Sequence, residues 1–279
     1  MTYGISVERL PDAGAPQVGI TVTGLGGAAV VSVDVSWDGG GSWHGVRGAQ
    51  RVTLVGGGFV RDHVPPLNVP AIYRLVVHGS TPAAAGPTEA AITVQSGTAW
   101  LQDPLAPRTA VAVRVSPGGD PGSSMLELGS LAGATYAQAV DVVIPQGASL
   151  PVASVGQRTL AGEVPLVVSH DVAAEGGALR RLLLSGGQLV ARGLPANVLE
   201  PVAHIVVGPA RETRSGDDLR VSTWQLTAMQ TRPQSLRIVV PWWTYDQVAA
   251  LWTGRTYADA RDSRPGDTYL DWQRNPEVP

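Results

Sequence analysis

Few of the residue types that could carry chemistry stand at the spacing that chemistry requires. The segment GLGGAA at residues 24–29 follows a strand-like stretch, and glycines so placed can cradle a phosphate where a helix begins. The residues that follow, Val30 to Ser36, alternate as a strand does. Because a pyrophosphate site needs the amino end of a helix, we predict a hairpin turn here instead.

Paired carboxylates could act as a general acid and base, or as calcium ligands. Asp217 and Asp218 lie in a glycine-containing loop and Asp259 fits a helix cap, with Asp262 nearby, so solvation and capping explain both pairs. The chain lacks cysteine and a GxSxG elbow, and its histidines show no metal-ligand spacing. We therefore predict no catalytic, cofactor-binding or metal-binding residue, no cofactor and no enzymatic activity. The histidines are His44, His63, His78, His170 and His204.

The adjacent residues Trp242 and Trp243 could stack on a sugar ring, as aromatic platforms do. Neighbouring residues that leave a strand point in opposite directions. We expect one indole to enter a core and the other to pack on the residues that follow.

The composition favours many short strands joined by turns. The 279 residues include 34 glycines and 22 prolines, and valine and threonine are abundant, which predicts an all-β protein with small helical additions. The net charge is −3 and no block of like charge occurs, so we expect no nucleic-acid sequence recognition and no charged membrane-surface patch. The apolar run Ile238–Trp243 is too short for a membrane span, and the first residues do not resemble a secretion signal.

Residues 1–96 are predicted to form a β-sandwich of the fibronectin type III or immunoglobulin kind. Val18, Ile20 and Val22 alternate with polar or small residues, as Val31, Val33 and Val35 do, which is the spacing of half-buried strands. Glycines at 39–41 predict a hairpin turn between Trp37 and Trp43. Tyr73 is placed where such folds use a tyrosine to hold a corner.

Residues 97–241 are predicted to form a second β domain, a barrel or sandwich with one helix. Residues 100–107 suggest an extended connector, because two prolines disfavour helix before them. Asp171 is expected to cap a helix that runs to Leu184 with Leu179, Leu182 and Leu183 inward. The polar segment Gly208–Asp218 is predicted to be a hairpin tip and a contact arm. Strands are expected at 110–115, 139–144, 159–168, 188–192, 204–207, 219–228 and 236–240.

Residues 242–279 contain three 12-residue units that each open on Thr-Tyr. Each unit pairs a threonine with a side chain three residues later that can complete a capping box: Thr244 with Gln247, Thr256 with Asp259 and Thr268 with Asp271. Helices this short are not stable alone in water. With the nearby tryptophans, they predict a helical docking tail.

Several segments in order resemble the minor tail proteins of long-tailed phages of actinobacteria. They are DGGGSW at 38–43, the proline-rich corner at 62–74, the connector at 98–107, residues 156–168 with the leucine-rich helix and SGGQLV at 185–190, and the terminal Thr-Tyr units. His63 and Val64 depart from the Tyr-Glu that this family usually carries at the corner. The order of the barrel segments resembles the module shared by tail-tube and distal tail proteins.

The resemblance implies a structural protein of the virion, made in the bacterial host cytoplasm, in the distal tail (tail tip). It implies a homo-oligomeric ring, with a hexamer favoured by tube symmetry and a trimer by a central spike. Other partners would be the tail tube, the tape measure and other minor tail proteins, and the role would be host attachment or genome delivery. An alternative function is a glycan-binding module that contacts the host cell wall. A cell-envelope hydrolase would need a carboxylate pair or metal cluster that the sequence does not show.

Overall fold

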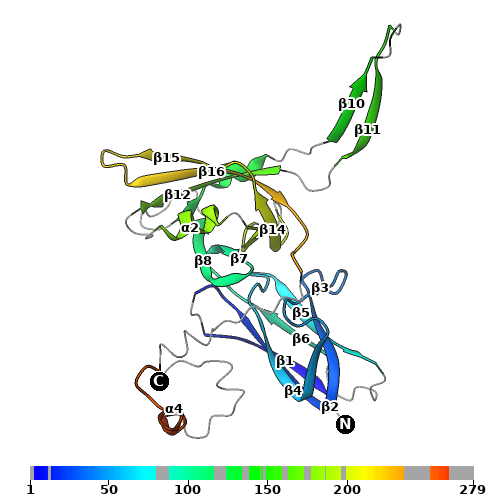
Figure 1. Ribbon diagram of the computed structural model, residues 1–279, viewed down its shortest axis with the longest axis vertical. Coiled ribbons are helices and arrows are strands. Elements are labelled where there is room, and N and C mark those ends of the chain that lie inside the picture. The colour runs from blue at the N-terminus through cyan, green and yellow to red at the C-terminus, as the bar shows by residue number, and fades with distance from the viewer. Residues whose placement is uncertain are drawn as a thin grey trace. The chain divides into compact units, whose positions relative to one another are not determined.

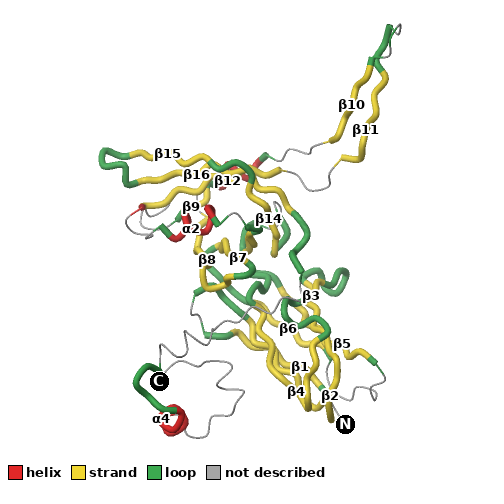
Figure 2. The backbone as a smooth tube through the Cα atoms, in the orientation of Figure 1, coloured by secondary structure: helices red, strands yellow, loops and turns green. Residues whose placement is uncertain are grey.

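The computed structural model in Figures 1 and 2 is built mostly of β-strands, which confirms the all-β prediction. It describes residues 3–11, 14–79, 88–115, 124–133, 138–144, 146, 149–158, 163–172, 177–185, 187–195, 199–235 and 252–263. The chain divides into two compact units. Unit 1 comprises Met1–Ser96, Pro104–Arg108 and Gln234–Pro279, and unit 2 comprises Gly97–Asp103 and Thr109–Pro233. The predicted division at residues 96 and 241 into three domains stays a prediction.

Unit 1 contains one six-stranded sheet organised around a long strand. Strand β2 pairs with β1 through its first half, with β5 through its second half, and with β4 through both. The strands are β1 (Gly4–Arg9), β2 (Val18–Ser36), β3 (His44–Gly45), β4 (Val52–Asp62), β5 (Pro70–His78) and β6 (Glu89–Thr93). The two-sheet arrangement of a fibronectin type III domain stays a prediction.

The alternating valines and isoleucine of β2 supply the core of unit 1. Each of the predicted inward residues is at most 5% exposed, which confirms the two-residue spacing. These residues are Val18, Ile20, Val22, Val31, Val33 and Val35.

The GLGGAA segment forms neither a helix nor the predicted hairpin turn. Gly24 and Gly26 have φ angles of 74° and 69°, and the pairing of β2 with β4 shifts register between Thr23 and Ala28. Glycine adopts these left-handed angles without steric cost, so the extra residues are absorbed as a bulge and the strand continues. On the facing strand, a Cβ at Gly57 would lie 2.5 Å from the carbonyl oxygen of Val22.

The proline-rich corner of unit 1 is held by the predicted tyrosine. The Tyr73 hydroxyl donates to Oδ2 of Asp62 at 2.8 Å, and Oδ1 of Asp62 accepts the Val64 backbone N–H at 2.9 Å. Tyr73 is fully buried and Asp62 is 3% exposed. The tyrosine therefore fastens the end of β4 to β5 across a turn of the chain.

The predicted turn after Trp37 is confirmed, since β3 pairs back on β2 and Gly39 and Gly40 have positive φ. The Asp38 carboxylate accepts the Ser42 hydroxyl at 2.6 Å and the Ser42 backbone N–H at 2.9 Å. The Ser36 hydroxyl donates to it at 2.7 Å. These bonds, with the Ser42 hydroxyl as the largest cause, hold the pKa of Asp38 well below its usual range.

Ser42→Ala should raise the pKa of Asp38 toward its ordinary value of 3.8, because the variant removes the strongest donor to the carboxylate. Since folding lowers this pKa, the turn is stabilised above the ordinary pKa and loses that stabilisation as the pH falls through the folded value. An NMR titration of the Asp38 carboxyl carbon measures the change. Ser42→Thr keeps a hydroxyl and should leave the titration near that of the parent. An unchanged titration in Ser42→Ala would contradict the assignment.

Unit 2 contains an eight-stranded sheet and a separate two-stranded sheet. Strand β12 pairs with β9 on one side and β16 on the other, so the sheet closes into a barrel, with β15 attached along β16. The strands of this sheet are β7 (Ala99–Asp103), β8 (Ala106–Val115), β9 (Met125–Leu126), β12 (Glu163–Asp171), β13 (Leu189–Arg192), β14 (Val202–Val207), β15 (Arg211–Ser215) and β16 (Val221–Gln230). The separate sheet pairs β10 (Gln138–Val143) with β11 (Val152–Arg158).

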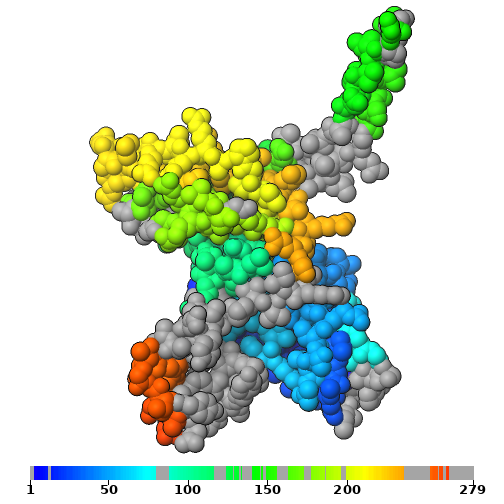
Figure 3. Space-filling model, in the orientation of Figure 1, coloured from blue at the N-terminus to red at the C-terminus, as the bar shows by residue number. Residues whose placement is uncertain are grey.

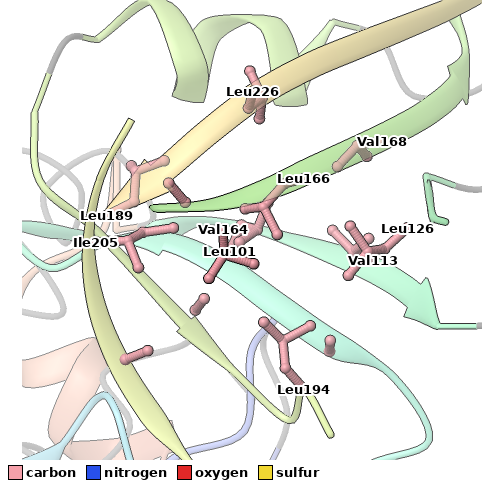
Figure 4. Close-up of a cluster of buried hydrophobic side chains, with 14 of the residues drawn as sticks. Leu101, Val113, Leu126, Val164, Leu166, Val168, Leu189, Leu194, Ile205 and Leu226 are labelled. Atoms are coloured by element: carbon pink, nitrogen blue, oxygen red, sulfur yellow. The ribbon is translucent and has the colours of Figure 1, made fainter. Parts of the chain in front are cut away.

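The inward residues of the barrel form one apolar cluster (Figure 4). Leu166 on β12 and Leu226 on β16 face each other across the ladder and are 1% and 3% exposed. Helix α2 (Ala178–Leu184) adds Leu179 and Leu182 to this core, with Leu183 packed against it, as predicted. A short 3-10 helix, Leu128–Ala132, follows β9.

Two details of unit 2 differ from the sequence-based predictions, and a third stays a prediction. Residues 100–107 are not a connector, because Ala99–Asp103 pairs with β13 and β8 begins at Ala106. Asp171 ends β12 opposite Val221 and forms an ion pair with Arg220 at 3.3 Å, and α2 begins after Gly177. Val172 is helical and residues 173–176 lie outside the described residues, so the helix cap predicted at Asp171 stays a prediction. Five of the eleven residues of the Gly208–Asp218 segment form strand β15, and only Gly216–Asp218 lie in the hairpin tip.

Within the tail, helix α4 (Tyr257–Ser263) begins at the predicted capping box. Oδ2 of Asp259 accepts the backbone N–H of Thr256 at 2.6 Å and its hydroxyl at 2.8 Å, and the Asp259 N–H donates to the Thr256 hydroxyl at 3.2 Å. The other two predicted capping boxes, at Thr244 and Thr268, lie outside the described residues, as does the strand predicted at 236–240.

Candidate assembly surface

The histidines considered as possible metal ligands make different local contacts. His44 stacks on Trp37 with ring centroids 4.0 Å apart, and Nε2 of His78 lies 2.7 Å from the Ser32 hydroxyl. His63 and His170 are buried in different units. Among the residues that the structure describes, no group of three histidines or carboxylates could hold a metal ion.

The paired carboxylates also have local contacts. Oδ1 of Asp218 accepts the Arg220 backbone N–H at 3.2 Å, and its other oxygen lies 3.4 Å from the Arg220 guanidinium. Asp259 serves the capping box. Trp242 and Trp243, the candidate sugar platform, lie outside the described residues.

One polar cluster that the sequence did not predict lies across β12, β16 and β15. The Ser222 hydroxyl donates to Oε1 of Glu212 at 2.7 Å, and Ser222 stands opposite His170 in the ladder. That hydrogen bond is the largest cause of the lowered pKa of Glu212, and the charges of Arg180 and Arg214 lower it further. Ser222 is fully buried, so its hydroxyl is held by the carboxylate and does not face solvent. The cluster fastens β15 to the barrel.

The most exposed apolar surface of unit 2 is the hairpin β10–β11, coloured green in Figure 3. Seven of its large aliphatic side chains are each between 54% and 75% exposed. They are Val140, Val142, Val143, Ile144, Leu150, Val152 and Val155. We call this set the aliphatic hairpin.

The register of the aliphatic hairpin places apolar side chains on both of its faces. Val140 stands opposite Val155 and Val142 opposite Ala153, all on one face. Val143 stands opposite Val152 on the other face, beside Asp141 and Ser154. A soluble two-stranded hairpin would usually carry polar side chains on at least one face. Neither face of this hairpin is wholly polar.

The backbone edges of this hairpin are also open. Among the described residues, β10 and β11 pair with each other and with no other strand. The outer edge of each strand therefore carries backbone groups that no described strand pairs. Sequence spacing indicated β10 at 139–144, but the valines of β11 are separated by Ala153 and Ser154 and gave no strand signal.

Comparison with known proteins identifies no relative, since no family model and no curated protein matches the chain. Within the described residues, no helix is long and apolar enough to cross a membrane.

Proposed function

We propose that this protein is a structural subunit of a phage tail tip, which assembles as a homo-oligomeric ring with other tail proteins and supports host attachment or genome delivery. The single observation that supports its role in assembly is the exposure of the aliphatic hairpin. The placement in a tail rests on the resemblance of the sequence segments to minor tail proteins. A hexamer is the favoured ring, and the site of action is the virion.

The physical argument for assembly starts from the weakness of an isolated hairpin. A two-stranded sheet is at best marginally stable in water, and more strands or a covering layer are needed to hold it. Fully burying one valine, leucine or isoleucine side chain contributes about 1.5–3 kcal/mol to stability. The seven exposed side chains of the hairpin lack much of this contribution because they remain in contact with water. A partner that covers them would stabilise both the hairpin and the complex.

A ring is the assembly in which such a contact repeats and closes. When a projection on one copy meets a different surface on the next, the contact is head-to-tail, and it gives a ring if the rotation closes. The tail tube, the tape measure and other minor tail proteins would then stack on this ring.

The mass of the purified protein tests the proposal directly. Light scattering coupled to size exclusion should give a multiple of the 29.0 kDa protomer, with six copies favoured over three. Symmetry-resolved imaging of particles carrying a labelled copy should place the label at the tail tip. A monomer at all concentrations together with unlabelled tails would overturn the proposal.

The glycan-binding alternative is tested by the same preparation. Binding to host cell-wall polysaccharide that is lost in Trp242→Ala or Trp243→Ala would favour it over a purely structural role.

A further inference from the structure

We propose that the aliphatic hairpin binds the same hairpin of a second copy, with β11 of one copy beside β10 of the next. Successive copies would then share one antiparallel sheet. This inference rests on the proposed function and specifies the partner and the contact that make the ring.

The first argument comes from the open backbone edges. A row of unpaired N–H and C=O groups is satisfied most completely by another strand, because a strand offers donors and acceptors at the same repeat. Each aliphatic hairpin has two such edges, one on β10 and one on β11. A chain of hairpins satisfies both edges of every copy, whereas a single added strand satisfies only one.

The second argument comes from charge. From residue 139 to residue 157 the chain carries one charged side chain, Asp141, and the next, Arg158, ends β11. Pairing β10 with β10 would bring two Asp141 carboxylates close together, and like charges across a sheet are destabilising. Pairing β11 with β10 instead separates the Asp141 carboxylates of neighbouring copies by a strand. Charge repulsion therefore disfavours the pairing of β10 with β10.

The third argument comes from direction. β10 and β11 run antiparallel within one copy. In copies related by rotation about a ring axis that runs along the hairpin, the hairpins point the same way, so β11 of one copy is antiparallel to β10 of its neighbour. The aliphatic face with Val140, Val142 and Val155 would then continue from copy to copy, because every copy presents the same apolar residues on the same face of the shared sheet.

The absence of cysteine from the sequence allows a clean crosslinking test. Val140→Cys on β10 and Val155→Cys on β11 are prepared as separate full-length variants and treated with a short bis-maleimide, alone and after mixing. We expect the mixture to give several-fold more covalent dimer than either variant alone. As a control, Ser215→Cys on β15 mixed with Val140→Cys should give little. The pair Val142→Cys and Ala153→Cys repeats the test should the first pair fail to assemble.

The outcomes separate this inference from the proposed function. Dimers formed equally by one variant alone would show like-strand pairing and overturn the inference. Assemblies of the expected mass that do not crosslink through either pair of cysteine variants would also overturn this inference. They would not contradict the proposed ring. A monomeric mass without crosslinks would overturn both.

Discussion

The triple variant Val140→Lys, Val142→Lys and Val155→Lys should be a monomer of about the protomer mass under conditions in which the parent assembles. Each lost apolar contact costs about 1.5–3 kcal/mol when the parent side chain is buried in the assembly. Since 1.4 kcal/mol is about tenfold in a dissociation constant, three substitutions should weaken association about a thousandfold or more. Like charges that meet between copies add to this loss.

Light scattering measures the mass of this variant, and circular dichroism checks that the strands of both units persist. Val55→Lys is the matched control, because Val55 lies on β4 in unit 1 and is 75% exposed. It should leave the mass unchanged. A triple variant that keeps the parental mass would contradict the assignment of the hairpin as the assembly surface.

Tyr73→Phe should destabilise unit 1 by about 1–3 kcal/mol, the usual cost of removing a buried hydrogen-bond partner. The variant keeps the ring and removes only the hydroxyl that donates to Asp62 at 2.8 Å. The Asp62 carboxyl stays buried with one donor fewer, so the penalty exceeds that of an exposed hydrogen bond. Urea unfolding followed by fluorescence and by NMR signals of β4 and β5 reports the shift in midpoint.

Tyr3→Phe makes the same chemical change at a half-buried tyrosine for which the described residues show no hydrogen bond, and it should move the midpoint little. Equal midpoints for the parent and Tyr73→Phe would show that this hydrogen bond does not stabilise the corner.

The sequence predicted those parts of the fold in which local pattern and tertiary environment agree. The alternation of Val18, Ile20 and Val22 marks a strand because the same side chains fill the core. The Thr256–Asp259 capping box forms from local hydrogen bonds alone, so its prediction needed no knowledge of the fold.

The errors arose where pairing over long distances decides the structure. Gly24, Gly26 and Gly27 are typical of a turn, but β4 pairs with both halves of β2, so the strand continues and these residues form a bulge. The polar segment 211–215 became a strand because β16 offers it an open edge.

The candidate site was predicted only in part, for the same reason. The spacing of Val140 and Val142 indicated a strand, but a strand pattern does not reveal whether the side chains find a core. Only the exposed fraction of the folded residues distinguishes this hairpin from the equally valine-rich β2.

The closure of the barrel also has a consequence for biosynthesis. Its ladder joins Leu101 to Ala191 and Glu163 to Met229, so β7 meets β13 only after residue 192 has been made, and the barrel closes only after residue 229 has left the ribosome. The strands of residues 4–93 complete their ladders much earlier in translation. The nascent polypeptide should therefore carry the complete six-stranded sheet of unit 1 while its unfinished barrel still exposes valine and leucine, a period in which a chaperone would limit aggregation.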